Sequence, residues 1–85
     1  MAFASAGRAL GIVLATGGEF SRARDEFAEA VRLKPDDSGA EANLGAALAE
    51  LGENQKAIAH FQRALQLDPQ NKLARENLDA LQKTP

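Results

Sequence analysis

The sequence predicts an all-α protein built from a helical hairpin that occurs twice, and three observations support this prediction. Alanine occurs 18 times in the 85 residues, and the Leu, Glu, Arg, Gln and Lys side chains that accompany it also lose little rotamer freedom in a helix. The chain matches itself when it is displaced by 34 residues. Within each copy, apolar residues recur three or four positions apart, which places them on one face of a helix.

The displacement aligns residues 4–37 with residues 38–71 without a gap. Twelve positions are then identical: Ala6/Ala40, Leu10/Leu44, Gly11/Gly45, Leu14/Leu48, Ala15/Ala49, Gly18/Gly52, Glu19/Glu53, Ala23/Ala57, Phe27/Phe61, Ala30/Ala64, Leu33/Leu67 and Pro35/Pro69. Chance would give about three or four identities in an alanine-rich chain, so the match indicates a structural repeat. The stretch RALGIVLATGGE has the charge and apolar run of a secretory signal peptide, but ANLGAALAELGE matches it in mid-chain. We therefore interpret the stretch as a helix.

The pattern predicts five helices, at about residues 4–16, 19–33, 38–51, 54–67 and 71–82. Gly17, Gly18 and Gly52 turn the chain within each copy, and Pro35 and Pro69 end the second helix of each copy. Ser38 and Glu41 have the spacing of a capping box that would begin the third helix. Small residues occupy positions where facing helices would approach closely, with Phe27 and Phe61 filling the space beside them. These small residues are Gly11, Gly45, Ala23, Ala57, Ala30 and Ala64.

These residues resemble the tetratricopeptide repeat, whose signature combines Leu-Gly, a large residue, Gly, Ala, an aromatic residue, Ala and Pro. The matching residues are Leu10, Gly11, Leu14, Gly18, Ala23, Phe27, Ala30 and Pro35 in the first copy, and Leu44, Gly45, Leu48, Gly52, Ala57, Phe61, Ala64 and Pro69 in the second. The resemblance implies antiparallel hairpins stacked as a short right-handed α-solenoid. It implies one domain over residues 1–85, with repeats at 4–37 and 38–71 and a C-terminal capping helix at 72–83. Gly7 and Glu41 replace the aromatic residue usual near the start of each repeat, so we expect looser packing there.

The two ends of the predicted array differ in polarity. The last helix surrounds Leu78 and Leu81 with the polar side chains of Lys72, Arg75, Glu76, Asp79 and Gln82, as a capping helix requires. The first helix is apolar around most of its circumference, at Phe3, Leu10, Ile12, Val13 and Leu14. Either a preceding helix of a longer array covers this face, or a second copy of the chain covers it through Phe3, Ile12 and Val13.

The sequence lacks the groups that most catalytic, metal and nucleic-acid sites require. Cysteine is absent, and the single His60 falls at a position that the repeat register makes outward-facing. No serine has a base at motif spacing, and no glycine-rich segment has the ending of a phosphate loop. The carboxylates of Asp25, Glu26 and Glu29 lie among Arg22, Arg24 and Arg32, as on a solvated helix face. We therefore expect neither an enzyme, a cofactor nor a metal site.

Charge and hydropathy exclude two classes of partner. The net charge is −2 with both signs interleaved, which does not favour binding to nucleic acid. No apolar segment approaches the roughly 20 residues needed to cross a bilayer. We expect a soluble protein without membrane contact, with the cytoplasm as the favoured compartment.

The resemblance implies a function in binding proteins. In the family, the first helices of successive repeats line a concave groove that accepts a peptide or a helix. The groove residues transferred by register include Arg8, Ile12, Thr16, Asn43, Ala46, Glu50, Leu73 and Asn77, together with Ser5, Ala9, Gly39, Ala42, Glu76, Ala80 and Lys83. Chaperone-tail-binding members hold a terminal carboxylate at positions that are Arg8, Ile12, Asn43, Leu73 and Asn77 here, of which only Asn43 matches outright. We therefore expect a protein-interaction module without that clamp, with a homo-oligomerisation element or the interaction arm of a larger enzyme as alternatives.

Overall fold

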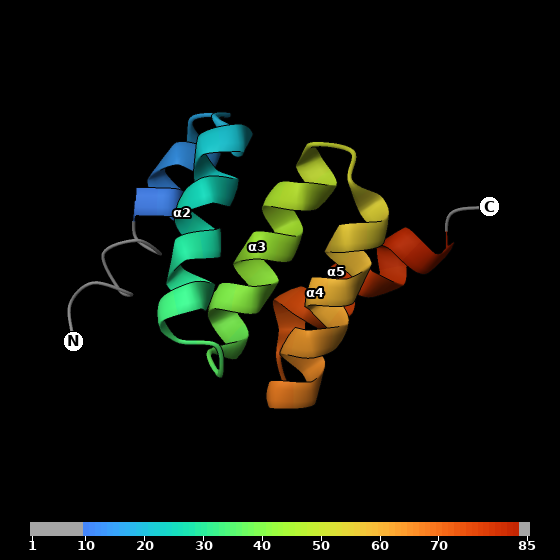
Figure 1. The fold of residues 1–85 in the computed structure, drawn as a ribbon. Coiled ribbons are helices and arrows are strands. Elements are labelled where there is room, and N and C mark those ends of the chain that lie inside the picture. The colour runs from blue at the N-terminus through green and yellow to red at the C-terminus, as the bar shows by residue number, and fades with distance from the viewer. Residues whose placement is uncertain (1–9, 84–85) are drawn as a thin grey trace.

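The computed structural model describes residues 10–83, and throughout this part of the chain short turns connect helices (Figure 1). The first helical segment covers residues 10–16. It is followed by α2 (Phe20–Leu33), α3 (Ser38–Glu50), α4 (Asn54–Leu67) and α5 (Lys72–Lys83). The all-α prediction is confirmed, and the expected helix boundaries agree within one residue. The expected start of the first helix lies outside the described residues.

The two hairpins repeat each other in geometry as well as in sequence. Both α2 and α4 contain 14 residues, and both follow a glycine, Gly18 or Gly52, with a φ of 83°. A side chain with a Cβ rarely adopts this left-handed conformation, so glycine is needed to reverse the chain. The helices pack in chain order, and α3 contacts α2, α4 and α5. Among the described residues, no helix is long and apolar enough to span a bilayer.

The predicted capping box at Ser38 is wrong, because the preceding residue, Asp37, is the N-cap of α3. The Asp37 carboxylate accepts a hydrogen bond from the Ala40 amide at 3.2 Å, and Ser38 is already the first residue of α3. Asp and Ser cap helices about equally well, and Asp37 has the extended backbone that an N-cap residue adopts. In the next repeat, Asn71 accepts from the Ala74 amide at 3.0 Å. The capping position therefore recurs after one repeat.

The Ser38 hydroxyl instead connects three helices. It donates to the Ala64 carbonyl near the end of α4 at 2.8 Å, and it accepts from the Asn71 side-chain amide at 2.7 Å. Asn71 thus caps α5 and also contacts the start of α3. These bonds fix the orientation of α5 relative to the second repeat.

Close packing around two phenylalanines forms the core, as the small residues predicted. Phe61 is 0% exposed and Phe27 is 3% exposed. A Cβ placed on Gly45 would lie 2.9 Å from Cε1 of Phe61, and one placed on Gly11 would overlap the ring of Phe27. Ala23, Ala57, Ala30 and Ala64 are also buried. The helices therefore approach each other at distances that only glycine and alanine allow.

His60 is not the ordinary surface residue that the sequence predicts. Its Nδ1 atom lies 2.7 Å from Oε1 of Glu41, whose side chain is only 7% exposed. A buried carboxylate needs a hydrogen-bond partner. The imidazole of His60 on α4 is the partner of Glu41 on α3. The replacement of an aromatic residue by Glu41 is therefore accommodated by a polar contact.

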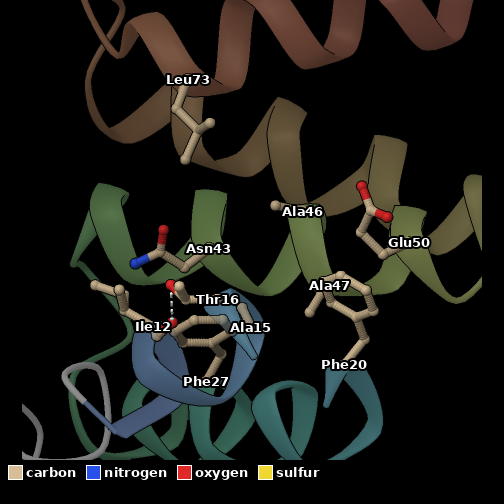
Figure 2. Close-up of a pocket in the computed structure, with 10 residues that line it drawn as sticks. All are labelled: Ile12, Ala15, Thr16, Phe20, Phe27, Asn43, Ala46, Ala47, Glu50 and Leu73. Carbon is tan, nitrogen blue, oxygen red and sulfur yellow. Dashed lines mark hydrogen bonds between the residues drawn. The ribbon is translucent and has the colours of Figure 1, made fainter. Parts of the chain in front are cut away.

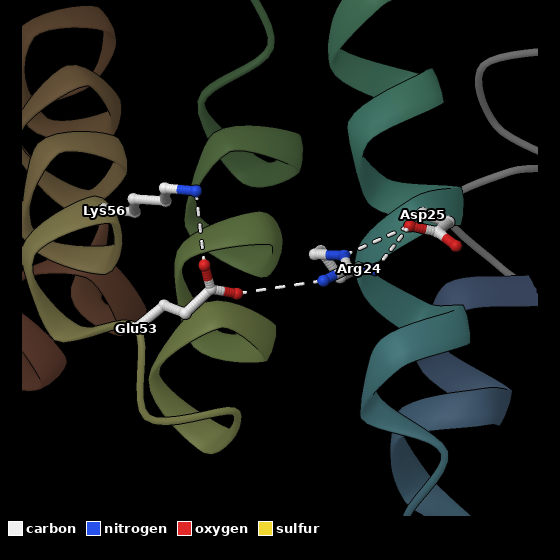
Figure 3. Close-up of polar contacts among 4 residues, drawn as sticks. All are labelled: Arg24, Asp25, Glu53 and Lys56. Carbon is white, nitrogen blue, oxygen red and sulfur yellow. Dashed lines mark hydrogen bonds and ion pairs between the residues drawn. The ribbon is translucent and has the colours of Figure 1, made fainter.

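An ion pair between Arg24 and Glu53 joins the two hairpins at the N-terminal end of α4 (Figure 3). Nη1 of Arg24 lies 3.7 Å from Oε2 of Glu53, and Nζ of Lys56 lies 3.2 Å from the other oxygen of that carboxylate. Arg24 also donates to Asp25 at 3.0 Å. These side chains are about one-third exposed or more, so each pair contributes at most about 1 kcal/mol to stability.

Candidate functional site

A hollow with a volume of about 300 Å³ opens between the first helical segment, α3 and the start of α5, and we call it the inter-repeat groove (Figure 2). Phe20 and Phe27 of α2 complete its lining. The full lining consists of Ile12, Ala15, Thr16, Phe20, Phe27, Asn43, Ala46, Ala47, Glu50 and Leu73. Most of these side chains are apolar, so the groove offers a ligand a largely hydrophobic surface.

Small side chains on one face of α3 keep the groove open. Asn43, Ala46, Ala47 and Glu50 follow each other at three- and four-residue spacing, which places them on one side of the helix. Leu73 projects from the first turn of α5 towards this face (Figure 2). The two alanines do not fill the space between the larger residues, and the groove results from this difference in size.

Three lining residues carry polar groups. The Asn43 side chain has no hydrogen bond to another residue of the described part, so its amide is available to donate and to accept. The Thr16 hydroxyl donates to the Ile12 carbonyl at 2.8 Å, which leaves its oxygen as an acceptor. Glu50 is exposed and forms no ion pair within residues 10–83. Asn43 and Thr16 can form hydrogen bonds with a ligand, and the Glu50 carboxylate can pair with a cationic group.

Of the fifteen residues transferred by register, six line the inter-repeat groove: Ile12, Thr16, Asn43, Ala46, Glu50 and Leu73. Asn77 does not line it, and its side-chain amide donates to the Leu73 carbonyl one turn earlier in α5 at 2.8 Å. Arg8 lies outside the described residues. Ala42, also transferred by register, is 0% exposed and therefore cannot contact a ligand.

Four lining residues were not assigned to a groove from the sequence: Ala15, Phe20, Phe27 and Ala47. Phe20 and Phe27 belong to α2, whereas the groove residues expected from the family belong to the first helix of each repeat. The signal that could have identified Phe20 is its position directly after the Gly-Glu turn, which returns the chain beside the first helix.

Outside the groove, the titratable side chains of residues 10–83 form no metal site. No group of three or more His, Asp or Glu side chains could hold a metal ion within the described residues. On the exposed surface of α2, a hydrogen bond from Arg32 lowers the pKa of Glu29 below its ordinary value. Neither residue lines the inter-repeat groove.

Comparisons with known proteins agree on one family. The family model described as the tetratricopeptide repeat matches residues 8–72. No curated protein sequence matches the chain, whereas 48 chains of solved structures match its fold. Among them is the NMR structure of the second TPR domain of the human RPAP3 protein in complex with the HSP70 peptide SGPTIEEVD. Its TM-score is 0.91 at 26% identity, over 98% of this chain and 69% of that chain.

Proposed function

Because the chain belongs to the tetratricopeptide repeat family, we propose that it is a non-catalytic interaction module that binds a peptide or helical segment of a partner protein. The inter-repeat groove is the proposed binding site. The observation that carries the proposal is an apolar hollow between successive repeats, with the Asn43 amide, which has no hydrogen-bond partner among residues 10–83, in its lining. Apolar side chains of a ligand would supply affinity, and the amide would fix its backbone.

The RPAP3 domain supports a peptide ligand, since it was solved in complex with one. The groove of this chain nevertheless differs from a carboxylate clamp. Two positions that carry polar clamp residues in chaperone-tail-binding members are the apolar Ile12 and Leu73 here, and both line the groove. Lys and Arg are absent from its described lining. We therefore propose a ligand other than a chaperone tail.

Blocking the groove is expected to abolish this function. Ala46→Arg places a long, charged side chain in an apolar hollow, and it should weaken peptide binding by about tenfold or more, because such a penalty exceeds about 1.4 kcal/mol. The probe is a peptide selected from a displayed random library on the wild-type chain, and titration calorimetry measures its affinity. Ala59→Arg, at an exposed position on α4 outside the groove, is the matched control.

In the same titrations, Asn43→Ala should weaken binding by about two- to tenfold, the net value of a hydrogen bond. Equal affinities for wild type, Ala46→Arg and Ala59→Arg would rule out the groove as the site. Equal affinities for wild type and Asn43→Ala alone would remove only the role of the amide.

A second candidate function is self-association through the first helical segment. Val13 is 67% exposed, and Leu10 and Ile12 on the same segment are 45% and 49% exposed. Leu10 and Val13 are three positions apart, which places them on one face of the segment as a patch that a second copy could cover, whereas Ile12 lines the inter-repeat groove. Phe3, which the sequence adds to this set, lies outside the described residues.

If the chain self-associates through this patch, Val13→Lys should weaken the dimer by about tenfold or more, because it places an unpaired charge in an apolar interface. Sedimentation equilibrium or light scattering across a concentration series measures the change. Leu33→Lys replaces an exposed apolar residue on α2 and should leave the association unchanged. A wild-type chain that stays monomeric at millimolar concentration would eliminate this candidate.

A further inference from the structure

We infer that the inter-repeat groove selects a partner segment that combines apolar side chains with a lysine or arginine, and that it disfavours acidic segments. This inference rests on the proposed function and adds the chemical class of the ligand. Glu50 is the charged residue among the described groove lining. It lies on the same face of α3 as the two alanines, beside Phe20 (Figure 2). A ligand whose apolar side chains enter the groove would therefore bring its neighbouring residues close to a carboxylate.

The hydrogen-bonding groups of the groove also favour a basic ligand over an acidic one. Ionised Glu50 only accepts, and the Thr16 hydroxyl proton is already given to the Ile12 carbonyl, so Thr16 also offers an acceptor. Asn43 is the lining side chain with free N–H groups. The described lining thus presents more acceptors than donors. A ligand rich in carboxylates would leave Glu50 without a donor, whereas an ammonium or guanidinium group would satisfy it.

Helix ends of both signs lie at the groove, because Phe20 is the first residue of α2 and Leu73 lies in the first turn of α5. Glu50 is the last residue of α3, whose last turn contains no basic residue, and Thr16 is the last residue of the first helical segment. The C-terminal end of a helix carries a partial negative charge from its carbonyl groups. The N-terminal ends of α2 and α5 carry the opposite partial charge, so the helix ends largely offset one another and the Glu50 carboxylate carries the preference for a cation.

The nearest cationic side chains in the sequence are paired with other carboxylates. Nζ of Lys72, next to Leu73, lies 3.8 Å from Oε2 of Glu76 along α5. Nη1 of Arg22, near Phe20, lies 3.0 Å from Oε1 of Glu19. Neither residue lines the groove. A basic side chain of the partner would thus meet a carboxylate that no described residue neutralises.

The test uses peptides selected from a displayed random library on the wild-type chain, and each selected peptide is then resynthesised with its basic residue changed to Gln or to Glu. We expect the selected pool to be enriched in Lys and Arg beside apolar residues. Glu50→Gln should weaken binding of the basic peptide by about two- to fivefold, as expected for an exposed charge pair. Glu50→Lys should invert the preference between the Lys and Glu versions. Glu26→Gln removes the same charge from α2 outside the groove, and it should change neither.

The outcomes separate this inference from the proposed function. Peptides that bind wild type, fail to bind Ala46→Arg and respond to neither Glu50 variant would overturn the charge preference while leaving the groove as the binding site. Selected peptides that are rich in Asp and Glu and fail to bind Ala46→Arg would likewise overturn the charge preference while leaving the groove as the binding site. Selected peptides that bind Ala46→Arg as well as wild type, or a library that yields no binder, would overturn both.

Discussion

Phe61→Ala should lower the free energy of unfolding by about 3–5 kcal/mol, the range for removing a buried aromatic ring. Phe61 is the largest side chain that is fully buried, and its ring packs against the backbone of α3 at Gly45. The loss would leave a cavity that the small neighbours, Ala57 and Ala64, cannot fill. Since the free energy of unfolding of globular proteins is only about 5–15 kcal/mol, Phe61→Ala would remove a large fraction of it.

Urea denaturation followed by circular dichroism measures this effect, and Phe20→Ala provides the matched control. Phe20 is only partly buried because it lines the inter-repeat groove, so the same chemical change should cost clearly less there. If both variants lost equal stability, the assignment of Phe61 to the centre of the core would be contradicted. A peptide titration of Phe20→Ala would additionally report on the groove.

Gly45→Leu should destabilise the fold by about 1–3 kcal/mol or more through overpacking. The first added carbon would already lie 2.9–3.1 Å from three ring atoms of Phe61, and this fully buried ring has no free space into which to move. Leucine favours a helix over glycine by about 0.8 kcal/mol, which offsets part of the cost but not all of it. Overpacking therefore outweighs the gain in helix propensity, and the net effect of Gly45→Leu on stability is unfavourable.

Thermal melts of Gly45→Leu and Gly17→Leu separate the size of the side chain from its location. Gly17 is exposed, and a Cβ there would make only ordinary contacts at 3.7 Å. We expect the midpoint of Gly17→Leu to remain near that of wild type, whereas that of Gly45→Leu falls by several degrees. An unchanged midpoint for Gly45→Leu would show that α3 and α4 do not approach as closely as described.

The helices could be predicted from the sequence because the same signals occur twice. Gly18 and Gly52 adopt the same left-handed conformation, and the two phenylalanines occupy equivalent places beside Gly11 and Gly45. Each copy thus supports the interpretation of the other. For the same reason, six of the fifteen residues transferred by register line one groove.

The features that the sequence did not reveal depend on contacts between distant residues. His60 meets Glu41 across two helices, 19 positions away, and helical spacing along α4 alone carries no information on that neighbour. The cap at α3 was misassigned because Asp37 and Ser38 are adjacent and both are good capping residues. The place of Phe20 in the groove could not be predicted, because it depends on how α2 packs beside the first helical segment.

α3 contacts α2, α4 and α5, and this central position affects how the molecule unfolds. Repeat proteins open readily from their ends, because a terminal helix has neighbours on one side only. α3 has no such freedom, since its release would remove packing support from α2, α4 and α5 at once. Loss of α3 therefore coincides with cooperative unfolding of all the helices packed against it.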